Sequence, residues 1–340
     1  MRPTTFAALA ALALAGAACK GGGDAAVQVD TTQLAMFAPL PETMESEANP
    51  LTDAKIELGR KLYYETRLSL GSDISCNSCH NLAAFGADTG AVSVGHQGRL
   101  GGRNSPTVYN AAGHIAQFWD GRAADVEEQA LGPILNPVEM AMPASPAVIS
   151  RIRGDAEYVR MFRAAFPDDR NPVTYENLGR AIGAFERRLV TPSRWDAFLG
   201  GTDTALTNAE KAGFNAFVST GCTTCHMGAY AGGTMFQKAG LVTPWPDTAD
   251  VGRESVTRNA VDRFFFKVPS LRNVASTGPY FHNGGVRSLD TAVVWMARHQ
   301  LGRQLEAEQL ARIVAFLGSL TGEIPRAYIA PPEGVAAGRD

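Results

Sequence analysis

One pentapeptide pattern occurs twice in the sequence, as Cys76-Asn77-Ser78-Cys79-His80 and as Cys222-Thr223-Thr224-Cys225-His226. In a C-x-x-C-H pentapeptide, two thiols can attach a c-type haem through thioether bonds while the histidine ligates the iron. Two alternatives exist, because paired cysteines of exported proteins also form disulfides and cysteine pairs also hold zinc. Neither motif is followed by the paired histidines of a zinc site. An immediate histidine in both copies favours two covalently bound haems c.

The residues around the two motifs also repeat. Leu51–Lys55 and Leu206–Glu210 each begin an amphipathic helix in the same manner, with Thr52 as the N-cap of the first. Downstream, Ile182–Phe185 is echoed by Ile313–Phe316, each with apolar residues at helical spacing. Each unit therefore contains an opening helix, a C-x-x-C-H motif, an irregular middle and a closing helix, which is the layout of a cytochrome c domain.

The fold class that follows is all-α, with two cytochrome c-like haem domains in tandem. Residues 46–195 form the first domain and residues 200–325 the second, and a chain of 340 residues is long enough for both. Strand signals are weak. The glycine- and proline-rich stretches 85–106 and 232–246 are typical of long irregular loops that wrap a haem.

The first 19 residues predict an export signal. A positively charged start precedes the apolar run 6–18, which is too short to span a bilayer. Cys19 directly after this run indicates a lipoprotein that is cleaved before Cys19 and lipidated there; the alternative is plain cleavage just before it. Residues 20–45 then form a flexible tether. We therefore expect a periplasmic protein, either free or anchored in the membrane through Cys19.

Composition excludes two other classes of protein. Hydrophobic residues make up 45% of the chain and charged residues 19%, which rules out disorder of the whole chain. The net charge is −3, and no cluster of lysine and arginine offers a surface for phosphates. Nucleic acid is therefore not an expected partner.

Several longer stretches resemble the bacterial dihaem cytochrome c peroxidases, the family that also contains MauG. The resemblance covers residues 51 to 320 in order and rests on Ser93–His96, Gly102–Thr107, Gln117–Ala123, Gly132–Pro133, Pro137–Met140, Lys267–Asn273 and Pro279–Gly284.

The resemblance implies a ligand set for each iron. His80 and His226 are the proximal ligands, His96 closes the first haem in the oxidised enzyme, and Met296 is the sixth ligand of the second haem. His96 lies in a glycine-bracketed loop and must leave before peroxide binds, so the oxidised enzyme is expected to rest in a nearly inactive state. Without the family, His96 would be a surface-loop histidine and Met296 a core residue on a helix.

The resemblance also implies the residues that act on peroxide and on electrons. Glu139 and Gln129 lie on the distal side of the first haem, where a carboxylate can move the peroxide proton and an amide can orient the peroxide. Trp119 lies between the two haems and shortens the electron path. Without the family, Glu139 would be a solvated helix residue and Trp119 a packed core residue.

A calcium site between the domains is a third implication. Asn104 would contribute its side-chain oxygen, and Thr277 and Pro279 their backbone carbonyls, with water completing the 6 to 8 oxygens that calcium prefers. The residues alone do not suggest this site.

The function implied is a periplasmic peroxidase that reduces hydrogen peroxide to water. Electrons come from a small carrier, a cytochrome c or a cupredoxin, enter at the second haem and pass to the first, and the family is commonly a homodimer. One alternative is a MauG-like dihaem oxidase acting on a partner protein, although that enzyme has tyrosine where Met296 stands. The other is a dihaem electron carrier without enzymatic activity, in which Glu139 and Gln129 would have no role.

Overall fold

The computed structural model describes residues 26–333 of the chain. Within them the helices are α1 (Thr31–Leu34), α2 (Asp53–Tyr63), α3 (Cys76–Cys79), α4 (Val126–Leu135), α5 (Ser145–Arg153), α6 (Ala156–Ala165), α7 (Tyr175–Glu186), α8 (Arg194–Leu199), α9 (Asn208–Thr220), α10 (Glu254–Thr257), α11 (Leu289–Leu301) and α12 (Ala307–Ser319). The described sheet consists of β1 (Phe236–Lys238) and β2 (Phe265–Lys267), which pair antiparallel. The helix-rich architecture expected from the sequence is confirmed, with this small sheet added to it.

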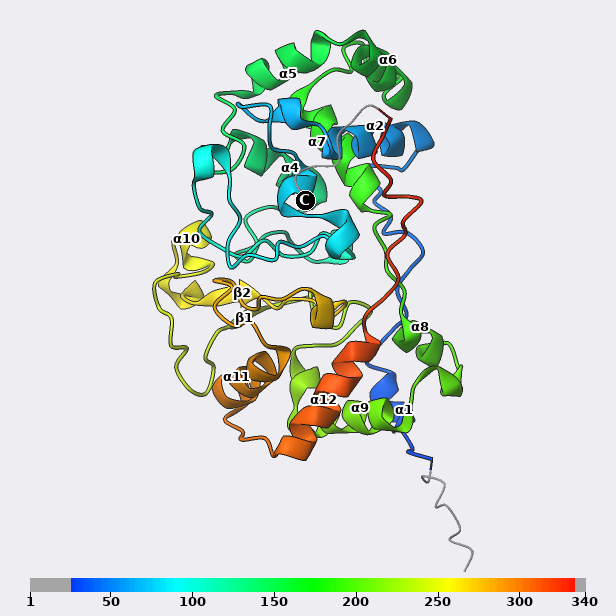
Figure 1. The fold of residues 1–340 in the computed structure, drawn as a ribbon, viewed down its shortest axis with the longest axis vertical. Helices are drawn as coiled ribbons and strands as arrows, with labels where there is room; N and C mark the ends of the chain where they lie inside the picture. Colours follow the sequence, from blue (N-terminus) through cyan, green and yellow to red (C-terminus); the bar gives the residue numbers. More distant parts are fainter. Residues whose placement is uncertain (1–25, 334–340) are drawn as a thin grey trace, which may run out of the picture.

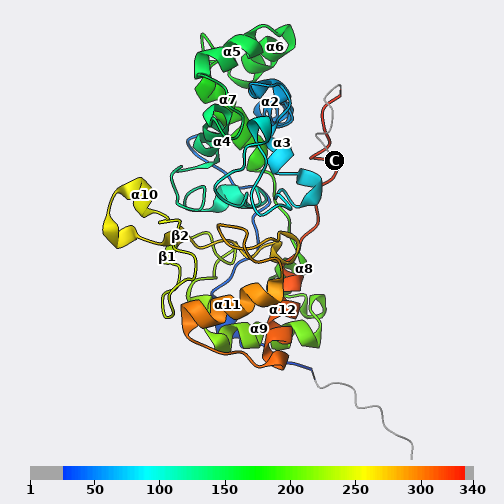
Figure 2. The same ribbon diagram turned by 60° about the vertical axis from the view of Figure 1, so that its left-hand side comes forward.

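The helices form two lobes (Figures 1 and 2). An N-terminal lobe contains α2 and α4 to α7, a C-terminal lobe contains α8, α9, α11 and α12, and the small sheet lies between them. Each lobe has its own cluster of buried apolar side chains. The division of the chain into domains 46–195 and 200–325 stays a prediction.

The internal repeat is visible in how each lobe is packed. In the N-terminal lobe α2 packs against α7, and in the C-terminal lobe α9 packs against α12. Both contacts are so close that a glycine is required: a Cβ at Gly59 would lie 1.9 Å from the Ala181 carbonyl oxygen, and one at Gly213 would lie 2.0 Å from that of Arg312. In both lobes, therefore, the opening helix crosses the closing helix at a glycine.

The two opening helices also begin as the sequence predicts. The Thr52 hydroxyl accepts a hydrogen bond from the Lys55 N–H (3.2 Å) at the start of α2. At the start of α9, the Thr207 hydroxyl accepts one from the Glu210 N–H (3.3 Å), and the Glu210 carboxylate accepts one from the Thr207 N–H (2.9 Å). Such caps satisfy N–H groups that the first helical turn leaves without partners.

The segment 26–45, which we call the N-terminal strap, differs from the flexible tether expected for residues 20–45. Phe37 is buried in the C-terminal lobe, with its ring centroid 5.5 Å from that of Trp195 and 5.7 Å from that of Phe214. Farther along, the Met44 N–H donates to the Arg187 carbonyl in the N-terminal lobe (3.0 Å). A polar composition does not reveal single apolar anchors of this kind, which fix the strap across both lobes.

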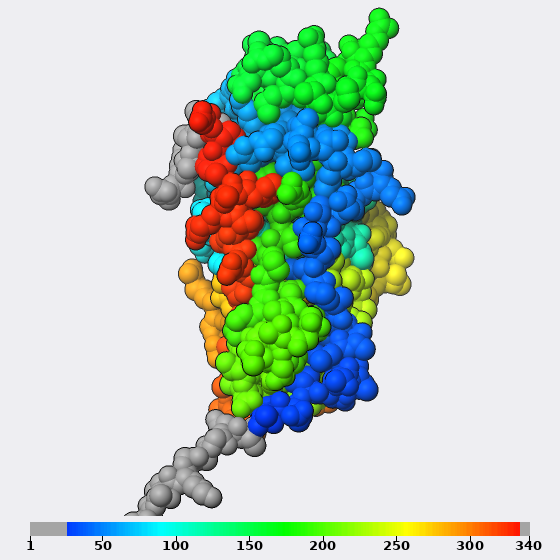
Figure 3. Space-filling view, turned by 90° about the vertical axis from the view of Figure 1, so that its right-hand side faces the viewer, coloured from blue at the N-terminus to red at the C-terminus, as the bar shows by residue number. Residues whose placement is uncertain are grey.

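Residues 321–333, the C-terminal strap, also run from the C-terminal lobe, at the end of α12, to the N-terminal lobe. Tyr328 stacks on Phe185 with ring centroids 5.1 Å apart, and Ile329 is buried in the N-terminal core. Figure 3 shows the two straps, blue and red, on the same side of the molecule. The beginning of the described chain thus packs on the C-terminal lobe, and its end packs on the N-terminal lobe.

The expected export signal, residues 1–19, and the expected lipidation site Cys19 lie outside the described residues. Among residues 26–333, no helix is both long and apolar enough to cross a bilayer.

Candidate functional site

A cavity of about 1050 Å³ is lined by residues of both lobes. A pocket for one small organic ligand usually measures roughly 300–1000 Å³, so this one has room for a large prosthetic group. Its wall contains every site residue expected from the sequence except His96, namely Cys76, Cys79, His80, Asn104, Trp119, Gln129, Glu139, Cys222, Cys225, His226, Thr277, Pro279 and Met296. The fold therefore brings the two C-x-x-C-H motifs, which are far apart in the sequence, to one cavity.

The four cysteines of the two motifs are free thiols. Cys76 and Cys79 are the first and last residues of α3, and burial raises the pKa of both thiols. Cys222 and Cys225 lie directly after α9, and burial raises their pKa as well. Neither pair forms a disulfide in the structure, so all four sulfur atoms are available for thioether bonds.

The two motif histidines are held in matching ways. Nδ1 of His80 lies 3.0 Å from the Pro106 carbonyl oxygen, and Nδ1 of His226 lies 3.2 Å from that of Ala231. A carbonyl can only accept, so each Nδ1 carries the proton and each Nε2 is left with a free electron pair. Burial lowers the pKa of His80 and lowers that of His226 to about 4, which keeps both rings neutral. Free thiols, oriented imidazoles and a large cavity all fit haem c.

Met296 lies on the cavity wall within α11. Leu289 and Val293, which are at helical spacing from it, line the same cavity and also pack on the C-terminal core. The helical face of Leu289, Val293 and Met296 therefore borders both the core and the cavity that His226 also lines, and ligation of the second iron by Met296 stays a prediction.

Glu139 and Gln129 line the cavity from two neighbouring segments. Gln129 belongs to α4, and Glu139 follows that helix closely in the chain. The Glu139 Oε1 atom accepts a hydrogen bond from Asn136 Nδ2 (2.9 Å). Burial raises the pKa of Glu139, while the nearby Arg122 charge and the Asn136 hydrogen bond act in the opposite direction.

Sequence reasoning did not identify Asn136 and Arg122 as partners of Glu139. The Arg122 guanidinium lies 3.4 Å from the Phe118 ring centroid and forms an ion pair with Asp120 (3.1 Å). The sequence did contain a signal for Arg122, because this residue belongs to Gln117–Ala123, one of the stretches that carry the family resemblance.

His96 is not on the cavity wall. It begins a short turn, His96–Gly98, in which Gln97 has a φ of 56°. The His96 N–H is shared between the carbonyl oxygens of Val138 (3.0 Å) and Glu139 (2.8 Å). A Cβ at Gly95 would lie 2.1 Å from that Val138 oxygen, so only glycine permits this contact. The loop is thus tied by its backbone to the segment that carries Glu139, and His96 does not line the cavity.

Trp119 connects the two lobes. Its Nε1–H donates to the Asn104 carbonyl (2.9 Å), and its own carbonyl accepts from the Lys267 N–H on β2 (2.8 Å). Asn104 is buried, and its Nδ2 donates to the carbonyls of Gly90 and Ala91 at 3.2 and 3.3 Å. Asn104, Thr277 and Pro279 line the same cavity, while no cluster of three or more His, Cys, Asp or Glu within residues 26–333 could hold a metal ion.

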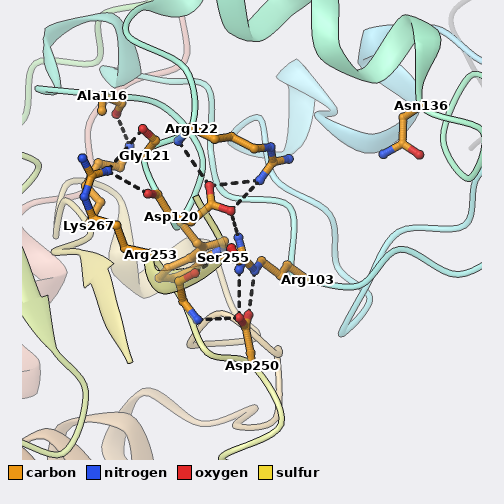
Figure 4. Close-up of polar contacts among 12 residues, drawn as sticks. Arg103, Ala116, Asp120, Gly121, Arg122, Asn136, Asp250, Arg253, Ser255 and Lys267 are labelled. Carbon is orange, nitrogen blue, oxygen red and sulfur yellow. Dashed lines mark hydrogen bonds and ion pairs between the residues drawn. The ribbon is translucent and has the colours of Figure 1, made fainter. Parts of the chain in front are cut away.

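A network of ion pairs beside this tryptophan joins the lobes further (Figure 4). Arg103 binds Asp250 of the C-terminal lobe at 2.6 and 2.8 Å and Asp120 of the N-terminal lobe at 2.5 Å. Arg253, next to α10, donates to the Asp120 carbonyl (3.0 Å). Asp250 and Arg253 lie more than 100 residues along the chain from their partners Arg103 and Asp120, so no local sequence signal indicates the network.

Comparison with known proteins identifies relatives over most of the chain. A family model described as di-haem cytochrome c peroxidase matches residues 53–204. Cytochrome c551 peroxidase of Pseudomonas aeruginosa is 46% identical over 300 residues, which is 86% of each chain. Cytochrome c551 peroxidase of Nitrosomonas europaea is 44% identical over 81% of this chain and 83% of its own. Among solved structures, a MauG-like protein associated with microbial copper homeostasis superposes with a TM-score of 0.73 at 28% identity, covering 86% of this chain and 95% of that one.

Proposed function

The chain belongs to the di-haem cytochrome c peroxidase family, and on this premise we propose that it reduces hydrogen peroxide to water in the periplasm with electrons from a small cytochrome c or cupredoxin. Each turnover takes up two electrons and two protons and releases two molecules of water. The observation that carries the proposal is the shared cavity, because Glu139 and Gln129 line it together with both C-x-x-C-H motifs.

The haem bound at each motif would supply an iron that exchanges single electrons, and the iron of the first would also bind peroxide. His80 would hold the first iron through its free Nε2, and His226 and Met296 would hold the second. Peroxide must lose a proton from one oxygen and gain one on the other before the O–O bond breaks. Glu139 is suited to both transfers because burial raises the pKa of its carboxyl and Asn136 fixes one of its oxygens. Gln129 would orient the peroxide by hydrogen bonding.

Electron entry at the second haem is proposed from Met296, since a thioether ligand raises a haem's reduction potential. Trp119 lines the same cavity and is hydrogen-bonded to Asn104 and Lys267, which supports a role for it in the electron path. Calcium at Asn104, Thr277 and Pro279 would bind next to this tryptophan, whose Nε1–H is bonded to the Asn104 carbonyl.

A MauG-like oxidase remains the second candidate function, favoured by the structural similarity to a MauG-like protein. The dihaem electron carrier is dropped, because the relatives that are 44–46% identical are peroxidases. The discriminating assay is the oxidation of reduced cytochrome c by peroxide, with and without prior reduction of the enzyme. A peroxidase consumes the cytochrome in proportion to peroxide, whereas an oxidase of partner proteins leaves it largely reduced.

Substitution of Met296 tests the second iron. In Met296→His that iron should stay low-spin while its reduction potential falls, because imidazole favours the oxidised metal more than a thioether does. The change is measured by redox titration, and by loss of the methionine-to-iron absorption band. If potential and band both stay unchanged, Met296 is not a ligand.

Substitution of His96 tests the proposed gate. The conformation described above, with the His96 side chain off the cavity wall, is the one that an open gate requires. Reversing a closed-to-open ratio from 99:1 to 1:99 takes about 5.5 kcal/mol, which an electron on the second haem and bound calcium would supply together. His96→Gly should leave the first haem high-spin when fully oxidised, and should react with peroxide without prior reduction. A wild-type enzyme that is already high-spin and fully active when oxidised would contradict the gate.

A further inference from the structure

Lys267 is a buried cation without a counter-ion. It belongs to β2 and is 8% exposed, and its Nζ donates to the Ala116 carbonyl (2.8 Å; Figure 4). No carboxylate of residues 26–333 lies within ion-pair distance of it, and burial lowers its pKa to about 8, so the charged form persists at neutral pH. A buried charge of this kind is costly unless an anion compensates it.

His114 stands beside this ammonium with an unused donor of its own. Its Nδ1 lies 3.4 Å from Lys267 Nζ. Because an ammonium can only donate, Nδ1 must accept, and the ring proton is therefore on Nε2. Burial and the Lys267 charge hold the pKa of His114 well below its usual range, so the ring is neutral. Its buried Nε2 has no hydrogen-bond partner.

Both side chains line the large cavity, next to the second C-x-x-C-H motif. The His114 ring makes an edge contact with Tyr230 (centroids 5.5 Å apart). The residue after Tyr230, Ala231, provides the carbonyl that accepts from His226 Nδ1. A buried cation without a counter-ion and a buried neutral N–H donor without an acceptor thus meet at one edge of the cavity, which His226 also lines.

We propose that Lys267 and His114 together bind a carboxylate, and that this carboxylate is a propionate of the haem attached at Cys222 and Cys225. The inference rests on the proposed function in one respect, that the second motif carries haem. A carboxylate accepts both hydrogen bonds at once and neutralises the ammonium. The pair would also offset the negative charge of the propionate near the second iron, which favours the reduced state and suits a haem that receives electrons first.

The test compares three substitutions in the enzyme loaded with two haems. Lys267→Met removes the charge at similar length, Lys267→Arg keeps it, and Lys238→Met removes an exposed cation from β1 as the matched control. Resonance Raman spectra report the propionate bending modes, and redox titration reports the second haem. In Lys267→Met we expect a shifted propionate mode and a roughly tenfold lower ratio of reduced to oxidised second haem at a fixed potential, equivalent to about 59 mV for one electron. Lys267→Arg should keep most of the wild-type propionate mode and of the wild-type potential of the second haem. Lys238→Met should change neither the mode nor the potential.

Several outcomes would overturn the assignment. An unchanged propionate mode and potential in Lys267→Met would do so, as would changes confined to the first haem. A potential that depends on added acetate would show that the pair binds a free anion instead. If Lys267→Met does not fold, His114→Phe is tested instead, because it keeps a ring but removes the Nε2–H. An unchanged propionate mode in His114→Phe would also overturn the assignment. The haem content of the wild type is measured first, because a wild type without a second haem would refute the proposed function. An unchanged propionate mode in the haem-loaded variant would refute only the present inference.

Discussion

Replacement of Glu139 by glutamine is expected to lower peroxide turnover by about 10²–10⁴-fold, the usual contribution of general acid–base catalysis. Glutamine can still accept the Asn136 hydrogen bond, so the segment should keep its position while losing the group that carries the proton. Steady-state oxidation of a reduced cytochrome c by peroxide measures the effect. Both haems should be present, with unchanged reduction potentials, because Glu139 is not proposed to ligate either iron.

The matched control is Glu176→Gln. Glu176 is an exposed carboxylate in the first turn of α7, and its replacement should leave turnover within a factor of about two. If Glu139→Gln keeps turnover within about threefold of the wild type, the proton is carried by another group and Glu139 serves only to position the loop.

Replacement of Arg272 by methionine should cost about 3–5 kcal/mol of the free energy of unfolding. Arg272 is 1% exposed, and its guanidinium binds Asp196 of α8 at 2.6 Å and the Ala229 carbonyl at 2.8 Å. Methionine would leave the buried Asp196 carboxylate without its cation, and would release the loop that follows His226. Urea unfolding of the haem-loaded protein, followed by circular dichroism, measures the change.

Arg312→Met is the control for this experiment. Arg312 forms an ion pair with Glu308 on the surface of α12, where both side chains are more than half exposed, and such pairs contribute about 0–1 kcal/mol. A loss below about 1 kcal/mol in Arg272→Met as well would mean that Asp196 finds other partners when the arginine is absent.

The helices were predictable because their signals are local. α2 and α9 begin at threonine caps next to the predicted helix starts, and α7 and α12 contain the apolar runs 182–185 and 313–316 at helical spacing. The crossing of α2 and α7 could not be predicted in the same way, because nothing near Gly59 indicates that the Ala181 carbonyl will approach it.

The same distinction between local sequence signals and long-range contacts applies to the candidate site. The C-x-x-C-H motifs and the family resemblance identified residues that the structure brings to one cavity. The pair formed by Lys267 and His114 was missed, because a contact between residues 153 positions apart depends on how irregular loops meet between the lobes. His96 does not line this cavity in the structure, so its predicted role as a ligand stays a prediction.

The exchange of the two straps bears on how the molecule assembles. Phe37 completes the core of the C-terminal lobe, although it stands at the beginning of the chain, and Ile329 completes the N-terminal core from the far end. A nascent N-terminal lobe therefore lacks part of its own interior until residue 329 has been synthesised. The two lobes are interdependent in folding, so cleavage of the chain near residue 200 would produce two incomplete halves rather than two autonomous cytochromes.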